Sequence, residues 1–138
     1  MYDQNFTSLP DLHGVPVFYP HGTQLIWISQ NGEITRPNHE TLAAELALGV
    51  VLLCHRRWSA TRAGIDIDHY LDVMELFAFV RPARFVLPTP SGLAQQLGLA
   101  RPQQGEDMAA LLPQIAFILL DELASTPDAA RTEAGRIA

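Results

Sequence analysis

The chain has 138 residues, of which 48% are hydrophobic and 17% charged, and its formal net charge is −6. This length fits one domain with a packed core and excludes wholesale disorder. The single cysteine excludes an internal disulfide and a cysteine-based zinc cluster. A −6 chain does not carry the basic stripe typical of a protein that binds nucleic acid unaided. Its nine basic residues are all arginine, and five of them form two small local groups, Arg56, Arg57 and Arg62 in one and Arg81 and Arg84 in the other.

We expect a cytoplasmic protein without a membrane partner. Met1 is followed by polar residues and not by a basic region with an apolar core, so no secretory signal is expected. No uninterrupted apolar run approaches the ~20 residues of a membrane helix. We expect one domain over 1–138, in which 1–12 is a loosely held lead-in and 127–138 is a terminal helix that continues in a longer chain.

The first part of the domain is predicted to be an antiparallel sheet. The apolar run Val15–Tyr19 is typical of a strand, and Pro16 marks its start or a sheet edge. Gln24–Ser29 is nearly all apolar, which predicts a strand that is covered on both faces. Asn31-Gly32 is a strong hairpin signal, after which Glu33–Arg36 returns as a third strand. These segments predict a three-strand meander.

A helix and a buried strand are predicted next. Asn38 is a suitable N-cap for a helix over His39–Leu48, which Gly49 would end. The continuous apolar run Val50–Cys54 predicts a buried strand that is parallel to a neighbour. A loop and a short helix are expected over His55–Gly64.

The spacing of apolar residues then predicts a helix that organises the chain. It would follow a brief extended piece at Ile65–Ile67, take Asp68 as its N-cap and end before Pro82. Its apolar stripe includes Leu71, Met74 and Phe77. We expect Phe77 to be a core anchor of this helix.

The acidic residues of the same segment are expected to be solvated. Asp68, Asp72 and Glu75 stand at spacings of four and three, which places them on one helical face. Two-metal phosphoryl chemistry needs carboxylates from separate parts of a fold, and the predicted central strands contain none. Asp72 and Asp107 are therefore only weak catalytic candidates, and no metal site is predicted.

Two further helices complete the predicted domain. Thr89 can cap a helix that has Pro90 at its first position and ends at Gly98. A long amphipathic helix is predicted over Glu106–Leu123. Because Pro113 falls inside it, we expect either a kink there or a helix that begins nearer to this proline.

The end of the buried strand offers candidate site residues. His55 with Arg56 and Arg57 could bind an anion, or His55 could be an ordinary surface histidine. Cys54 could be a nucleophile near this histidine, or it could be a buried and inert thiol. The second interpretation is favoured for Cys54, because adjacent strand positions point to opposite faces.

Aromatic residues offer a further possibility. Phe18, Tyr19 and Trp27 lie in apolar runs, where aromatic side chains more often form the core than stack on bases. Trp58 lies in a predicted loop and is expected at the surface. Any nucleic-acid contact is predicted to be weak and centred on the basic-aromatic cluster Arg56, Arg57 and Trp58.

The order of these elements and the stretch DVMELFAFVRPARFVLPTPSGLAQQLGL, Asp72–Leu99, resemble a known family. The stretch looks like part of the N-terminal domain of alphaproteobacterial DinG-type ATP-dependent DNA helicases, closely over 72–99 and by pattern over 15–123. That domain is similar to the DEDD 3′–5′ exonucleases. The resemblance implies an α/β fold of the ribonuclease H-like kind, with an antiparallel three-strand meander and one or more parallel strands, flanked by helices.

The catalytic residues of those exonucleases do not carry over. Their first strand ends in Asp-x-Glu, whereas Val17–Tyr19 stands there in this chain. Arg56 takes the place of an asparagine, and Asp107 is shifted by one position from the last acidic motif. Asp72 matches an acidic position outside the metal-binding set. The resemblance thus implies a degenerate, exonuclease-like domain without a metal site.

The implied function is that of a non-catalytic accessory domain in DNA repair, which positions single-stranded DNA or a partner protein beside helicase motor domains of the same chain. No cofactor is expected in this domain. ATP and magnesium would serve the motor, because the sequence contains no GxxxxGK[ST] motif. Two alternatives are an active metal-dependent 3′–5′ exonuclease that uses Asp72 and Asp107, and a stand-alone protein-interaction module.

Overall fold

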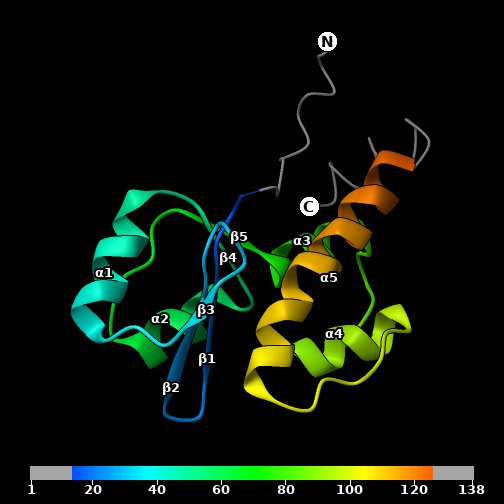
Figure 1. Cartoon of the computed structure of the whole chain (residues 1–138). Coiled ribbons are helices and arrows are strands. Elements are labelled where there is room, and N and C mark those ends of the chain that lie inside the picture. Colours follow the sequence, from blue (N-terminus) through cyan, green and yellow to red (C-terminus); the bar gives the residue numbers. More distant parts are fainter. Residues whose placement is uncertain (1–13, 126–138) are drawn as a thin grey trace.

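A five-stranded mixed sheet forms the middle layer of the molecule and has helices on both faces (Figure 1). The structure is a computed structural model, and it describes residues 14–125. The elements are β1 (Val17–His21), β2 (Gln24–Ile28), β3 (Ile34–Thr35), α1 (His39–Leu48), β4 (Val51–Leu53), α2 (Arg56–Ala63), β5 (Tyr70–Asp72), α3 (Val73–Val80), α4 (Pro90–Leu97) and α5 (Gly105–Ser125). The predicted lead-in and terminal helix lie outside the described residues.

The strands are arranged in the order β3-β2-β1-β4-β5. β1 pairs with β2 and β2 with β3 in antiparallel fashion, whereas β4 is parallel to both β1 and β5. The predicted meander and the predicted parallel strand are therefore confirmed. The protein is a mixed α/β domain.

The first hairpin runs further along the chain than the sequence predicted. β1 ends at His21, and Pro20 pairs with Leu25 inside it. A proline has no N–H to donate to a sheet, but β4 pairs with β1 only at Val17, so no ladder is broken on that side of Pro20. The third strand is shorter than expected, because only Ile34–Thr35 pairs with β2.

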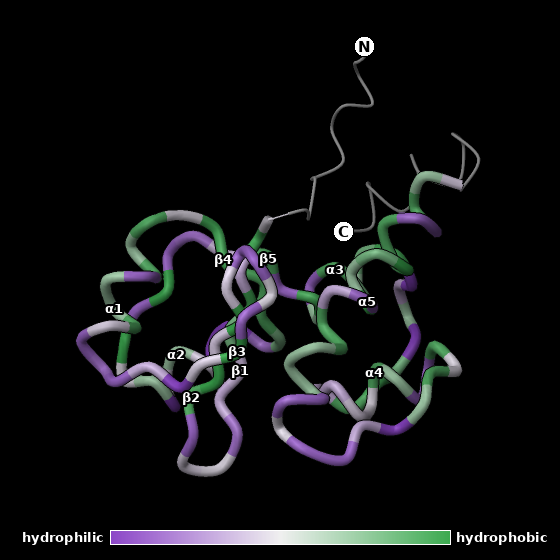
Figure 2. The backbone as a smooth tube through the Cα atoms, viewed as in Figure 1, coloured by the Kyte–Doolittle hydropathy of each residue, from purple (hydrophilic) through white to green (hydrophobic). Residues whose placement is uncertain are grey.

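Alternate side chains of the strands serve two separate cores. The core beneath α1 and α2 is made of Phe18, Trp27, Leu42, Leu46, Val51, Leu53, Ala63 and Ile67. The core beneath α3, α4 and α5 is made of Val17, Tyr19, Ile26, Leu52, Cys54, Val73, Phe77, Leu93, Ala109, Leu112, Ile115, Ala116 and Leu119. Figure 2 shows hydrophobic colour along the strands and along the inner parts of the helices. The prediction that Trp27 belongs to the core is confirmed, as is the two-sided burial of its strand.

The helix caps that the sequence indicated are present. The Asn38 side chain accepts a hydrogen bond from the backbone N–H of Thr41 at 2.8 Å, and α1 has its predicted bounds. Thr89 accepts from the backbone N–H of Gly92 at 3.0 Å, and α4 ends at Gly98, whose φ of +72° suits glycine.

The predicted helix from Asp68 to Pro82 is partly wrong. Tyr70–Asp72 is a strand, β5, and its residue Leu71 pairs with Leu52 of β4. The helix α3 begins only at Val73, after Asp72 as N-cap. A helical spacing of apolar residues was present locally, but pairing with β4 satisfies the backbone of this segment and overrides it. The expected extended piece at 65–67 is not a strand.

The helix α5 covers the sheet on the side of α3 and α4 (Figure 1). It begins at Gly105, so the alternative that it begins nearer to Pro113 is wrong. A Cβ atom at Gly105 would lie 2.7 Å from the Ile26 side chain, so glycine permits the close approach to β2. By length and composition alone α5 could span a membrane, but such a test is also passed by core helices, and α5 buries residues such as Leu112 and Ile115 against the sheet.

Phe77 is 1% exposed in the core under α5, whereas Phe117 on α5 is 67% exposed. We expect Phe77→Ala to lower the free energy of unfolding by about 3–5 kcal/mol, because it removes a large buried side chain and leaves a cavity. Phe117→Ala is the matched control and should change it by less than about 0.5 kcal/mol. Urea unfolding of both variants measures this. Equal effects would contradict the assignment of Phe77 to the buried face of α3 and of Phe117 to the exposed face of α5.

Candidate functional site

Two hollows lie side by side where the parallel strands β4 and β5 end, and they share His55 and Pro88. One has a volume of about 350 Å³ and is lined by His55, Arg56, Arg57, Tyr70, Asp72, Met74, Glu75 and Pro88. The other has a volume of about 270 Å³ and is lined by Tyr19, Cys54, His55, Trp58, Pro88, Thr89 and Pro90. Ligand sites of α/β proteins are typically found at this edge of a sheet. We take the two hollows together as the candidate site.

The carboxylate of Asp72 forms the floor of this site and is fully engaged by the backbone. Its Oδ1 accepts hydrogen bonds from the N–H of His55 at 2.8 Å and of Met74 at 2.9 Å, and its Oδ2 accepts from the N–H of Arg56 at 2.8 Å. Asp72 is only 5% exposed, while Asp68 and Glu75 are exposed. The prediction of one solvated acidic face is therefore wrong, because Asp72 ends a strand and caps a helix instead.

His55 makes the turn that brings these amides to Asp72. It has a left-handed backbone with φ +66°, which is uncommon for a residue with a Cβ atom. Its Nδ1 accepts a hydrogen bond from the N–H of Trp58 at 3.2 Å, so His55 is the N-cap of α2. This role was missed, because the residues that usually signal an N-cap are Ser, Thr, Asp and Asn.

Two of the first three amides of α2 are no longer available to an external anion. Those of Arg56 and Trp58 already have acceptors in Asp72 and His55. Any anion at this helix end would meet the amide of Arg57, arginine side chains and the fixed charge of Asp72. Anion binding by His55 together with its neighbours thus depends largely on the guanidinium groups.

The two arginines of the predicted cluster differ in their freedom. The Nε of Arg56 donates to the carbonyl of Ile67 at 3.1 Å, and its guanidinium lies 5.4 Å from the centre of the Tyr70 ring. Arg57 is exposed, and within residues 14–125 its side chain has no hydrogen bond or ion pair. Arg56 is therefore held in place by the fold, and Arg57 is free to contact a ligand.

Trp58 is half-buried and does not lie in an exposed loop as predicted. It belongs to the first turns of α2, and its ring centre lies 6.0 Å from that of Tyr19. The guanidinium of Arg62 lies over the Trp58 ring, 5.6 Å from its centroid, and also donates to the carbonyl of Gly22. Trp58 and Tyr19 form an aromatic wall of the smaller hollow.

The thiol of Cys54 also lines the smaller hollow, but it is 1% exposed. Burial, with a smaller contribution from the charge of Asp72, raises the pKa of the Cys54 thiol far above its usual range. Burial likewise raises the pKa of Tyr19. A neutral thiol is a weak nucleophile, which supports the inert interpretation of Cys54.

Asp107, the other weak catalytic candidate, lies in a different part of the fold. It is exposed in the first turn of α5, and its Oδ2 accepts from the N–H of Gln104 at 3.2 Å. It lines neither of the two hollows, whereas Asp72 lines the larger one. Among the residues that the structure describes, no three His, Cys, Asp or Glu side chains are grouped as metal ligands would be.

Four residues outside the predicted cluster also line the site and had no signal in the sequence. Pro88 and Thr89 lie in the connection between α3 and α4, Pro90 is the first residue of α4, and Tyr70 belongs to β5. The run Pro88–Pro90 predicted only the start of a helix and not a contribution to a site. No protein-family model, no curated protein and no solved structure matches the chain.

We expect Asp72→Asn to lower the free energy of unfolding by roughly 2–4 kcal/mol. The substitution replaces one carboxylate oxygen by an NH2 group, which is itself a donor and cannot accept hydrogen bonds from the backbone N–H groups. Hydrogen bonds to a charged acceptor are worth about 1.5–3 kcal/mol. Asp68→Asn, on an exposed neighbour, is the control and should change stability by less than about 0.5 kcal/mol. Urea unfolding measures both, and faster exchange of the His55 and Arg56 amides in Asp72→Asn would locate the loss.

Proposed function

We propose that this chain is a non-catalytic, exonuclease-like domain of a DNA helicase that positions single-stranded DNA, or a partner protein, beside the motor. The proposal includes a ribonuclease H-like fold and a cytoplasmic location. Support for the fold comes from the meander followed by parallel strands, which is the arrangement that the helicase resemblance implies. ATP and magnesium would be bound by the motor domains and not by this domain.

The observation that carries the non-catalytic part is the state of Asp72. A carboxylate that holds metal ions for phosphodiester cleavage must direct oxygen lone pairs at the cations. Both oxygens of Asp72 accept backbone hydrogen bonds instead, and Arg56, whose positive charge would oppose a cation, lines the same hollow. This arrangement favours a structural role for Asp72.

In the proposed contact, one end or one bend of a single DNA strand is bound in the candidate site. A base can stack in the hollow beside Tyr19 and Trp58, because aromatic faces accept any base. The free guanidinium of Arg57 lies on the lining of the adjoining hollow, where it can pair with a phosphate. One free arginine on a −6 chain supports only weak binding.

We expect Arg57→Ala to weaken binding to a fluorescein-labelled oligothymidylate and to flatten the plot of log K against log salt by roughly 0.7, the value for one lost single-strand phosphate contact. Fluorescence anisotropy at several low salt concentrations measures both. Arg101→Ala, on an exposed arginine between α4 and α5, is the matched control and should leave the slope unchanged. If the unmodified chain does not bind the oligonucleotide at all, a stand-alone interaction module is favoured over a DNA-positioning domain.

We also expect the purified chain to leave labelled single-stranded DNA intact when it is incubated with manganese. The carboxylates that the resemblance would require on the first strand are replaced by apolar residues, and Asp72 is engaged by amides. Gel electrophoresis of the product checks this. Degradation that is lost in Asp107→Asn but kept in Asp66→Asn, an exposed control, would establish the nuclease alternative instead.

A further inference from the structure

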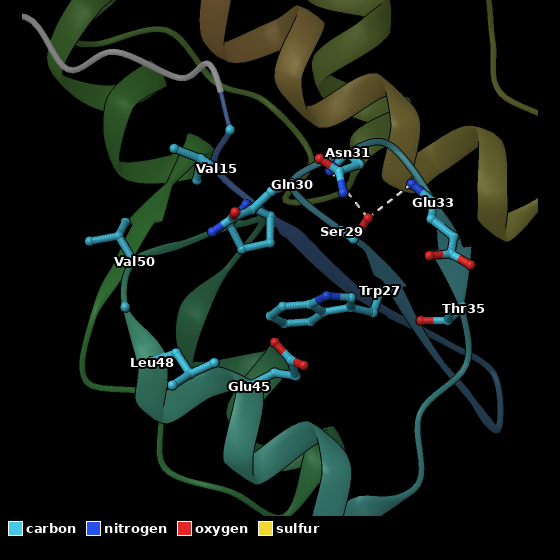
Figure 3. A pocket seen from close by; sticks show the side chains of 13 residues that line it. Val15, Trp27, Ser29, Gln30, Asn31, Glu33, Thr35, Glu45, Leu48 and Val50 are labelled. Carbon is cyan, nitrogen blue, oxygen red and sulfur yellow. Dashed lines mark hydrogen bonds between the residues drawn. The ribbon is translucent and has the colours of Figure 1, made fainter.

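A larger hollow lies at the opposite end of the sheet (Figure 3). It has a volume of about 610 Å³ and is bordered by the end of β2, the start of β3, the last turn of α1 and the residues that precede β1 and β4. Val15 and Val50 line it before these two strands begin, whereas Tyr19 in the middle of β1 and Cys54 directly after β4 line the candidate site. The two regions are thus separated by the length of the strands.

The indole of Trp27 lines this hollow and has an unused hydrogen-bond donor. Trp27 is only 5% exposed, and its Nε1–H has no acceptor within residues 14–125. Figure 3 shows the ring between Glu45 of α1 and the polar side chains Ser29 and Asn31 at the end of β2. A buried N–H without a partner is unfavourable, so a ligand that supplies an acceptor here gains from satisfying it.

The charge of this hollow is negative. Among residues 14–125, Glu33 and Glu45 are the charged residues that line it, and no arginine or histidine of that part of the chain does. Glu45 is half-buried, has no ion pair among the described residues, and points toward the face of the Trp27 ring in Figure 3. A carboxylate beside an aromatic face favours a cation, because both attract positive charge.

The rim of the hollow is apolar. Leu48 is 81% exposed and Val50 is 51% exposed, and both line the hollow. Figure 2 shows hydrophobic colour that continues from the end of α1 into β4. Leucine and valine side chains at this exposure offer apolar contact area to a ligand that covers them.

We propose that this hollow binds a short basic peptide segment of a partner protein. A lysine or arginine side chain of the segment lies between Glu45 and the Trp27 ring, and a peptide carbonyl accepts the hydrogen bond from Trp27 Nε1–H. An apolar neighbour in the segment packs on Leu48 and Val50. A nucleic acid does not fit this chemistry, since its phosphates would be repelled by Glu33 and Glu45.

The test is a titration of the ¹⁵N-labelled full chain with the blocked tripeptide acetyl-Leu-Lys-Leu-amide, followed by NMR of the two indole N–H signals. Trp27→Phe identifies the signal of Trp27. We expect this signal to move downfield and to saturate, and the signal of Trp58 to stay. Acetyl-Leu-Gln-Leu-amide, which lacks the positive charge, should bind at least about threefold more weakly.

Matched substitutions on α1 locate the charge contact. Glu45→Gln should weaken binding of the lysine peptide about three- to fivefold, the upper range for a partly exposed ion pair. Glu40→Gln, on the exposed first turn of the same helix, should leave binding unchanged. Equal binding of the two peptides, equal effects of the two substitutions, or no movement of the Trp27 signal at millimolar peptide would overturn the proposal. Movement of that signal by oligothymidylate would assign the hollow to nucleic acid instead.

Discussion

Two connections of the fold meet at the carboxylate of Asp72, and the geometry of the sheet's carboxyl edge depends on it. One connection joins β4 to α2 and offers the N–H groups of His55 and Arg56, and the other joins β5 to α3 and offers that of Met74. A buried charge is tolerated when hydrogen bonds satisfy it, and the positive ends of two helix dipoles add to this. Asp72 therefore fixes the start of both helices relative to the parallel strands.

The hydrogen bonds of Asp72 also determine which ligands the carboxyl edge of the sheet can bind. With Asp72 in place, the amides of Arg56 and Trp58 are satisfied and a negative charge is already present, so a phosphate is left with the amide of Arg57 and with side chains. Arg56 is turned back toward Ile67 and Tyr70, which leaves Arg57 as the free cation of the cluster among the described residues. The same interaction that stabilises this edge thus limits its attraction for nucleic acid.

Local signals in the sequence predicted much of the fold. Asn38, Thr89 and Asn31-Gly32 act through contacts within a few residues, and their caps and turn are found where predicted. Asp72 could not be interpreted in this way, because two of its three backbone partners lie 16 and 17 positions earlier in the chain. The candidate site was likewise predicted only in part. The cluster Arg56, Arg57 and Trp58 was predicted, but the left-handed turn at His55 and the contribution of Pro88 and Pro90 were not.

The two ends of the sheet differ in charge although the chain as a whole is acidic. The carboxyl edge carries Arg56, Arg57 and Arg62 on α2 beside the carboxylates of Asp72 and Glu75, whereas the charged residues that line the hollow at the other end are, among those described, Glu33 and Glu45. A uniform acidic surface would repel polyanions everywhere and attract basic segments everywhere. Three of the arginines stand on one short helix next to the strand ends, and the hollow that Glu33 and Glu45 line is at the other end. The proposed contacts with an anionic strand and with a basic segment therefore use different surfaces of one small domain.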